Sequence, residues 1–203
     1  MNARNIAQIE NFFLRNKERE PGAINCVTDI VGILIGLKPT ALIDFSSEEM
    51  KKVSRSEIKA ALEKVGLKCI FYSRKTVSAN KLFLNEMIFV SKKFDSAVKL
   101  YNAFIKMWSS IDEIGQIIDK KTWIKTTRQI GKLLGYPNTA IDSFIKNEIR
   151  HKSGNDSLVI ISDKYKNFAH SKKYAEKEVK LYNKPLDEAI KKYAPKIYEL
   201  SNK

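Results

Sequence analysis

The residues whose types and spacing suggest a chemistry are cations and small polar side chains between positions 127 and 152. Amide and hydroxyl groups can hydrogen-bond to base edges, while arginine and lysine can neutralise phosphates. If a helix begins near Asn138, one of its faces carries Asn138, Thr139, Ser143, Lys146 and Asn147. The cations that flank this face are Arg128, Lys132, Arg150 and Lys152. These residues predict a nucleic-acid contact, although Asp142 on the same face would repel phosphates.

Positioning such a face requires two closely crossing helices, and residues 127–146 (TRQIGKLLGYPNTAIDSFIK) have the pattern for them. The first helix needs an apolar and then a small residue, the turn needs a glycine, and the second helix needs apolar anchors. The residues that meet these needs in order are Ile130, Gly131, Leu134, Gly135, Tyr136, Ile141 and Phe144. The segment, with its flanks at 122–150, resembles a helix-turn-helix of the bacterial and archaeal regulator type. Two short core helices joined by a Gly-Tyr-Pro turn would give the same pattern.

The same stretch has a second resemblance, carried by Gly131 to Pro137 (GKLLGYP) with Ala140 and Phe144 after it. It resembles a Gly-x-Leu-Leu-Gly-Tyr-Pro motif of an uncharacterised, largely archaeal protein family. In that family the tyrosine-proline pair is typically followed, one residue on, by two adjacent cysteines. Thr139 and Ala140 occupy those positions here. This chain therefore lacks the residues on which a thiol or metal role in that family would depend.

The charge of the whole chain also bears on its partners. The 203 residues include 37 basic and 23 acidic ones, a formal net charge of +14, which would attract polyanions. Lysine supplies most of this charge, and a lysine excess also arises from biased base composition or adaptation to high temperature. A second basic patch is expected around a predicted strand pair, comprising Lys68, Arg74, Lys75, Lys81, Lys92 and Lys93. It is either a further nucleic-acid contact or a protected sheet edge.

Local signals predict an α+β fold that is mainly helical. Helices are expected over 3–18, from a cap at Asn25 through Leu37, from Ser54 with a capping box to Gly66, over 97–108, and on either side of Pro137. Strands are expected at 67–73 and 82–91 as a small antiparallel sheet, and 158–161 offers one more. A helical stretch should run from 169 to 200. We expect residues 1–150 to form an α+β core domain and 151–203 a mainly helical extension packed on the same core.

Catalytic and metal-binding patterns find little support in the sequence. His151 and His170 have no cysteine or carboxylate at metal-ligand spacing, and phosphate-loop and dinucleotide fingerprints are absent. Cys26 and Cys69 lie in apolar stretches and are expected to be buried thiols. No cofactor, metal or membrane partner is predicted, and the polar amino terminus favours a cytoplasmic location.

Three hypotheses follow. The first is DNA binding, in which the helix-turn-helix-like segment docks on the duplex and lysines provide long-range attraction. The second is a non-catalytic interaction or scaffold protein whose basic surface meets an acidic protein or a ribosomal surface. The third is an enzyme whose site is assembled from dispersed Asp, Lys and Tyr residues, which would require a deep pocket with inward-pointing carboxylates.

Overall fold

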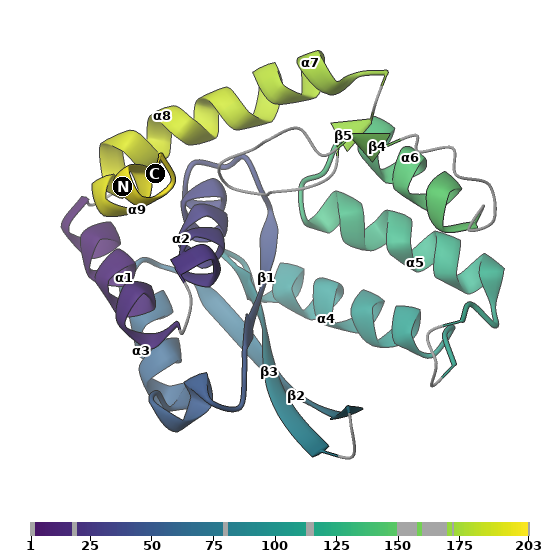
Figure 1. Cartoon of the computed structure of the whole chain (residues 1–203), viewed down its shortest axis with the longest axis horizontal. Helices are drawn as coiled ribbons and strands as arrows, with labels where there is room; N and C mark the ends of the chain where they lie inside the picture. The colour runs from purple at the N-terminus through teal and green to yellow at the C-terminus, as the bar shows by residue number, and fades with distance from the viewer. Residues whose placement is uncertain are drawn as a thin grey trace.

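A three-stranded antiparallel sheet with helices on both faces forms the frame of the protein (Figure 1). The computed structural model describes residues 3–17, 20–78, 81–112, 116–149, 158–159, 170–171 and 173–202, and gives the backbone alone for 20–21, 74–78, 81–85, 158–159 and 170. The strands of the sheet are β1 (Thr40–Phe45), β2 (Lys68–Ser78) and β3 (Lys81–Ser91), in the order β1-β3-β2. The predicted pairing of 67–73 with 82–91 is confirmed, and the hairpin is longer than expected.

The third strand of this sheet was not predicted. β1 pairs antiparallel with β3 and opposes Thr40 to Ser91. The predicted extra strand at 158–161 is present only as β4 (Leu158–Val159), which pairs with β5 (His170–Ser171) in a separate two-stranded ladder. The expectation that it extends the main sheet is therefore wrong. A two-residue strand pairs with whatever edge lies nearest, and that edge cannot be found from local sequence.

The larger core lies on one face of the sheet. Successive residues of a strand point to opposite faces, so Ile88 and Val90 enter this core while Phe89 between them does not. The helices that cover this face are α1 (Ala3–Asn16), α2 (Glu20–Leu34), α3 (Arg55–Lys64), α8 (Lys184–Tyr193) and α9 (Pro195–Leu200). Figure 1 shows them grouped on one side of the strands. Phe13 and Phe45 are fully buried at the centre of this layer.

The opposite face is covered by α4 (Phe94–Trp108), which packs Leu100 and Phe104 against Phe89. Helix α5 (Lys120–Leu133) lies against α4, and α6 (Asn138–Ile149) lies against α5. A small third cluster around Trp123, Ile141 and Ile145 joins α5 to α6. The chain is thus α+β and mainly helical, as predicted.

Local signals set most helix boundaries. Ser54 accepts a hydrogen bond from the Glu57 amide and the Glu57 side chain accepts one from the Ser54 amide, which confirms the predicted capping box of α3. The predicted cap at Asn25 is wrong, because α2 begins at Glu20 and Asn25 lies inside it. Pro21 is compatible with that start, since the first turn of a helix does not need its amide hydrogen.

The carboxy-terminal helices pack on the same core as the amino-terminal ones. After the short elements α7 (Ala175–Glu178) and the π-helical η2 (Val179–Asn183), helices α8 and α9 bury Leu186, Ile190 and Ile197. The buried carboxylate of Glu10 in α1 accepts a hydrogen bond from the Ile197 amide at 2.8 Å. The two ends of the chain therefore lie together (Figure 1). One 3-10 turn, η1 (Glu49–Lys51), links β1 to α3. Within the described ranges, no helix has the length and apolar character needed to cross a bilayer.

Candidate functional site

The segment predicted to bind nucleic acid folds as two helices, α5 and α6, joined by a short turn. Asp119 caps α5 by accepting a hydrogen bond from the Thr122 amide at 3.0 Å. The helices approach most closely at Gly131, where an added Cβ would lie 2.6 Å from Cγ1 of Ile141. Trp123 stacks on Phe144 at the other end, with ring centroids 6.4 Å apart. A small residue at position 131 is therefore a packing requirement.

The turn between these helices is held against the α2–β1 connection. Gly135 has a φ of +80°, and an added Cβ would meet the Leu37 carbonyl and Lys38 Cα at 3.1 Å. The Tyr136 amide donates to the Gly131 carbonyl at 2.8 Å and so closes the end of α5. Thr40 of β1 donates to the Leu133 carbonyl at 2.6 Å. These contacts fix the end of the helix pair on the sheet.

A buried ion pair lies beneath this turn. Lys38 Nζ donates to Asp29 of α2, and the Lys38 side chain is only 6% exposed. Its ammonium lies 5.6 Å from the centroid of the Tyr136 ring. Burial opposes the charged form of Lys38, but the Asp29 carboxylate and Tyr136 outweigh it and raise the pKa of Lys38. Burial raises the pKa of Tyr136 as well, so both groups stay protonated at neutral pH.

The face of α6 predicted to read bases is partly engaged within the protein. Thr139 donates a hydrogen bond to Glu178 of α7, whose buried carboxylate also accepts from the Ser171 amide at 2.9 Å. Ser143 and Asn147 are half-buried and have contacts of their own. Asn138 and Lys146 are exposed. The carboxy-terminal segment thus contacts one side of the predicted recognition helix.

The predicted phosphate-binding cations have different surroundings. Arg128 forms an ion pair with Asp142 at 2.8 Å, joining α5 to α6, and both side chains remain about half exposed. Lys132 is exposed. Arg150 and Lys152 lie outside the residues that the structure describes.

A row of exposed cations along α5 was missed by the sequence analysis. Lys121, Lys125, Arg128 and Lys132 recur at intervals of four, three and four residues and share the exposed face of the helix. We call these four residues the α5 cation stripe. The signal was available in the sequence, because the spacing of the lysines mirrors that of the buried residues Trp123, Thr127 and Gly131. The analysis had used only the apolar side of that pattern.

The second predicted basic patch is divided by the strand register. Lys68 lies opposite Ser91 and hence near Lys92 and Lys93, whereas Arg74, Lys75 and Lys81 lie toward the far end of the hairpin. About six residues of strand separate the two groups, which is roughly 20 Å. Lys68 is 4.0 Å from Glu63, and Lys92 donates to the Leu34 carbonyl at 2.9 Å. The side chains of Arg74, Lys75 and Lys81 lie outside the described part of the chain.

Buried carboxylates that could serve catalysis have structural partners. Glu86 binds Arg55 and Ser73 at 2.5 Å, and Glu49 binds Lys17 at 2.8 Å. Glu10 and Glu178 accept the backbone hydrogen bonds described above. Burial raises the pKa of the Cys26 thiol, which keeps it protonated and unreactive. Within the described ranges, no group of three or more His, Cys, Asp and Glu side chains could hold a metal ion.

Comparisons with known proteins provide no further guide. No family model, no curated protein and no solved structure matches this chain. Arguments about function therefore depend on its own residues.

Proposed function

We propose that this protein binds nucleic acid, with the α5 cation stripe contacting phosphates and α6 lying beside it. The observation that carries the proposal is the stripe itself. Four cations occupy the exposed face of one helix, and α5 contains no acidic residue. Lys146 of α6 is also exposed, one turn beyond Asp142. Clustered cations of this kind bind polyphosphates by releasing condensed counterions.

The dimensions of the stripe suit a nucleic-acid strand. From Lys121 to Lys132 is eleven residues, about 16 Å along the helix axis. Phosphates of one DNA strand advance about 3.4 Å along the duplex axis, so about five of them lie over that length. Side chains repeated every one to two turns could each reach a phosphate. The net charge of +14 adds long-range attraction.

The α6 face supports phosphate contact better than base reading. The Thr139 hydroxyl is bonded to Glu178, and Ser143 and Asn147 are half-buried. Asn138 remains exposed at the start of α6. We therefore propose binding with little sequence preference, in which the helix-turn-helix-like segment presents α5 to the phosphates. This differs from insertion of α6 into the major groove.

The test is the salt dependence of binding, measured by fluorescence anisotropy with labelled duplex DNA and single-stranded RNA. The variant carries Lys121→Gln, Lys125→Gln and Lys132→Gln. Each phosphate contact contributes about 0.9 to the slope of log K against log salt concentration for B-DNA. Loss of three contacts should lower the magnitude of the slope by about 2 to 3 and weaken binding strongly at low salt.

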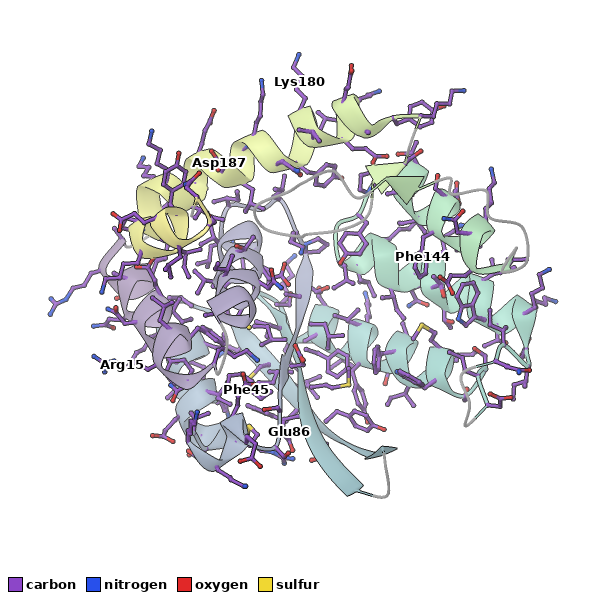
Figure 2. The ribbon with its side chains drawn as sticks, viewed as in Figure 1. Arg15, Phe45, Glu86, Phe144, Lys180 and Asp187 are labelled. Carbon is purple, nitrogen blue, oxygen red and sulfur yellow. The ribbon has the colours of Figure 1, made fainter. Side chains whose placement is uncertain are left out.

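The matched control changes three exposed lysines elsewhere, Lys177→Gln, Lys180→Gln and Lys184→Gln, and so removes the same charge. Lys180 lies on the outer face of the carboxy-terminal helix, away from α5 (Figure 2). Equal losses in both variants would reduce the binding to net charge and refute a role for the stripe. Absence of binding at low salt would refute the proposed function. Tighter binding of polyglutamate than of DNA would favour the acidic-partner hypothesis instead.

A further inference from the structure

An apolar pocket opens between α4, α5 and α6, on the side of α5 opposite the cation stripe. Its volume is about 330 Å³. The residues of its wall that matter here are Met107, Thr127, Ile130, Tyr136, Ile141 and Phe144. Phe144 is 41% exposed and marks where the pocket meets the surface (Figure 2). The side chains that enclose this space are otherwise largely apolar.

One polar atom of the pocket wall has no hydrogen-bond partner. Thr127 is 8% exposed, and its Oγ1 is buried without a partner. A threonine within a helix usually bonds to the carbonyl four residues earlier, which is that of Trp123. That carbonyl accepts instead from Thr126 Oγ1 at 3.1 Å. Leaving a hydroxyl unpaired in an apolar environment is costly, so the Thr127 hydroxyl requires an explanation.

The chemistry of the wall distinguishes between possible occupants. A buried water usually makes about three hydrogen bonds, but the wall offers the Thr127 hydroxyl among apolar groups, while Tyr136 interacts with Lys38 and Asp29. A charged molecule would lose its hydration without gaining a counterion. An uncharged apolar molecule with one hydroxyl or carbonyl would fill the space and satisfy Thr127. An engineered apolar cavity of about 150 Å³ binds benzene, so about twice that volume suits a bicyclic ring.

We propose that this pocket binds a small, uncharged, largely aromatic or aliphatic molecule through apolar contacts and one hydrogen bond to the Thr127 hydroxyl. The site is independent of the proposed nucleic-acid contact, because the stripe residues lie on the other face of α5. Ile141 and Phe144 of α6 and Ile130 of α5 would contact the ligand.

The experiment uses two probes that differ in one hydroxyl, 2-naphthol and naphthalene, with the full chain labelled at isoleucine and methionine methyl groups. Titration followed by NMR should shift the methyl signals of Met107, Ile130 and Ile141. The variant Thr127→Val keeps the shape of the side chain but removes its hydroxyl. It should weaken 2-naphthol binding about 3- to 10-fold, the range for one neutral hydrogen bond. Naphthalene binding should be unchanged or slightly tighter.

A second variant, Phe144→Ala, tests the apolar wall without requiring the hydroxyl. Because Phe144 is partly exposed, its removal should leave the fold intact and weaken both probes. The proposal is refuted if neither probe shifts the pocket methyl groups up to its solubility limit. It is also refuted if Thr127→Val affects both probes equally, since the hydroxyl would then have no part in recognition.

Discussion

Replacement of Asp29 by Ala should remove the partner of a buried cation and destabilise the whole α5–α6 attachment. The Lys38 side chain is 6% exposed and that of Asp29 is 21% exposed, so water can replace the lost carboxylate only poorly. Breaking a buried pair by removing one member costs about 3–5 kcal/mol. Domains are typically stable by about 5–15 kcal/mol. Asp29→Ala should therefore lower the free energy of unfolding by a large fraction of its total.

The pH dependence of this loss gives a sharper test. In the native protein the pKa of Lys38 is raised above its ordinary value, so its contribution to stability is present at neutral pH and falls only as pH rises through that pKa. In Asp29→Ala, burial acts without the carboxylate and should lower the pKa of Lys38. A lowered lysine pKa costs stability while the group is forced to be charged, and this cost decreases as pH rises. The deficit of the variant should thus shrink from neutral pH to about pH 10.

Urea unfolding monitored by circular dichroism at several pH values measures both effects. The double variant Asp29→Leu and Lys38→Met should recover most of the loss, because paired removal of a buried ion pair is often neutral or stabilising. Glu48→Ala serves as the control, since Glu48 and its partner Lys51 are both exposed and their pair should contribute at most about 1 kcal/mol. A deficit in Asp29→Ala no larger than that of Glu48→Ala, or one that grows with pH, would contradict the argument.

Two further predictions concern close packing and a buried acid. Gly131→Ala should destabilise the protein by about 1–3 kcal/mol despite the higher helix propensity of alanine, because its Cβ would overlap Ile141; thermal unfolding measures this, and addition of Ile141→Val should restore part of the loss. Burial raises the pKa of Glu10 even though backbone amides including that of Ile197 oppose the shift, so wild-type stability should fall as pH rises through the carboxyl range. Glu10→Gln should improve relative to wild type between about pH 4 and pH 7, and a constant difference in unfolding free energy across that range would count against the raised pKa.

The parts of the fold that were predictable depend on neighbouring residues. The Ser54–Glu57 box, the apolar stripe of α4 and the Gly-Tyr-Pro turn are local patterns, and each is found where it was expected. β1 was missed because its pairing partner β3 lies more than 40 residues away and nothing in Thr40–Phe45 specifies that contact. The β4–β5 ladder was misplaced for the same reason.

The candidate site was predictable in part. The sequence identified the helix pair and several of its cations, and it contained the spacing of Lys121 and Lys125, which went unused. It could not show that Glu178 binds Thr139, since 39 residues separate them. The association of Lys38 and Tyr136 also arises only from the tertiary packing of the turn on the α2–β1 connection.

The attachment of the Gly135 turn has a mechanical consequence. With that end fastened to β1 and α2, the two helices can separate only as the arms of tweezers do, with least movement near Gly131 and most near Trp123 and Phe144. Any molecule wedged between the arms would swing the free end of α5 and alter the line along which its lysines are aligned. The fulcrum would stay fixed while the tips moved.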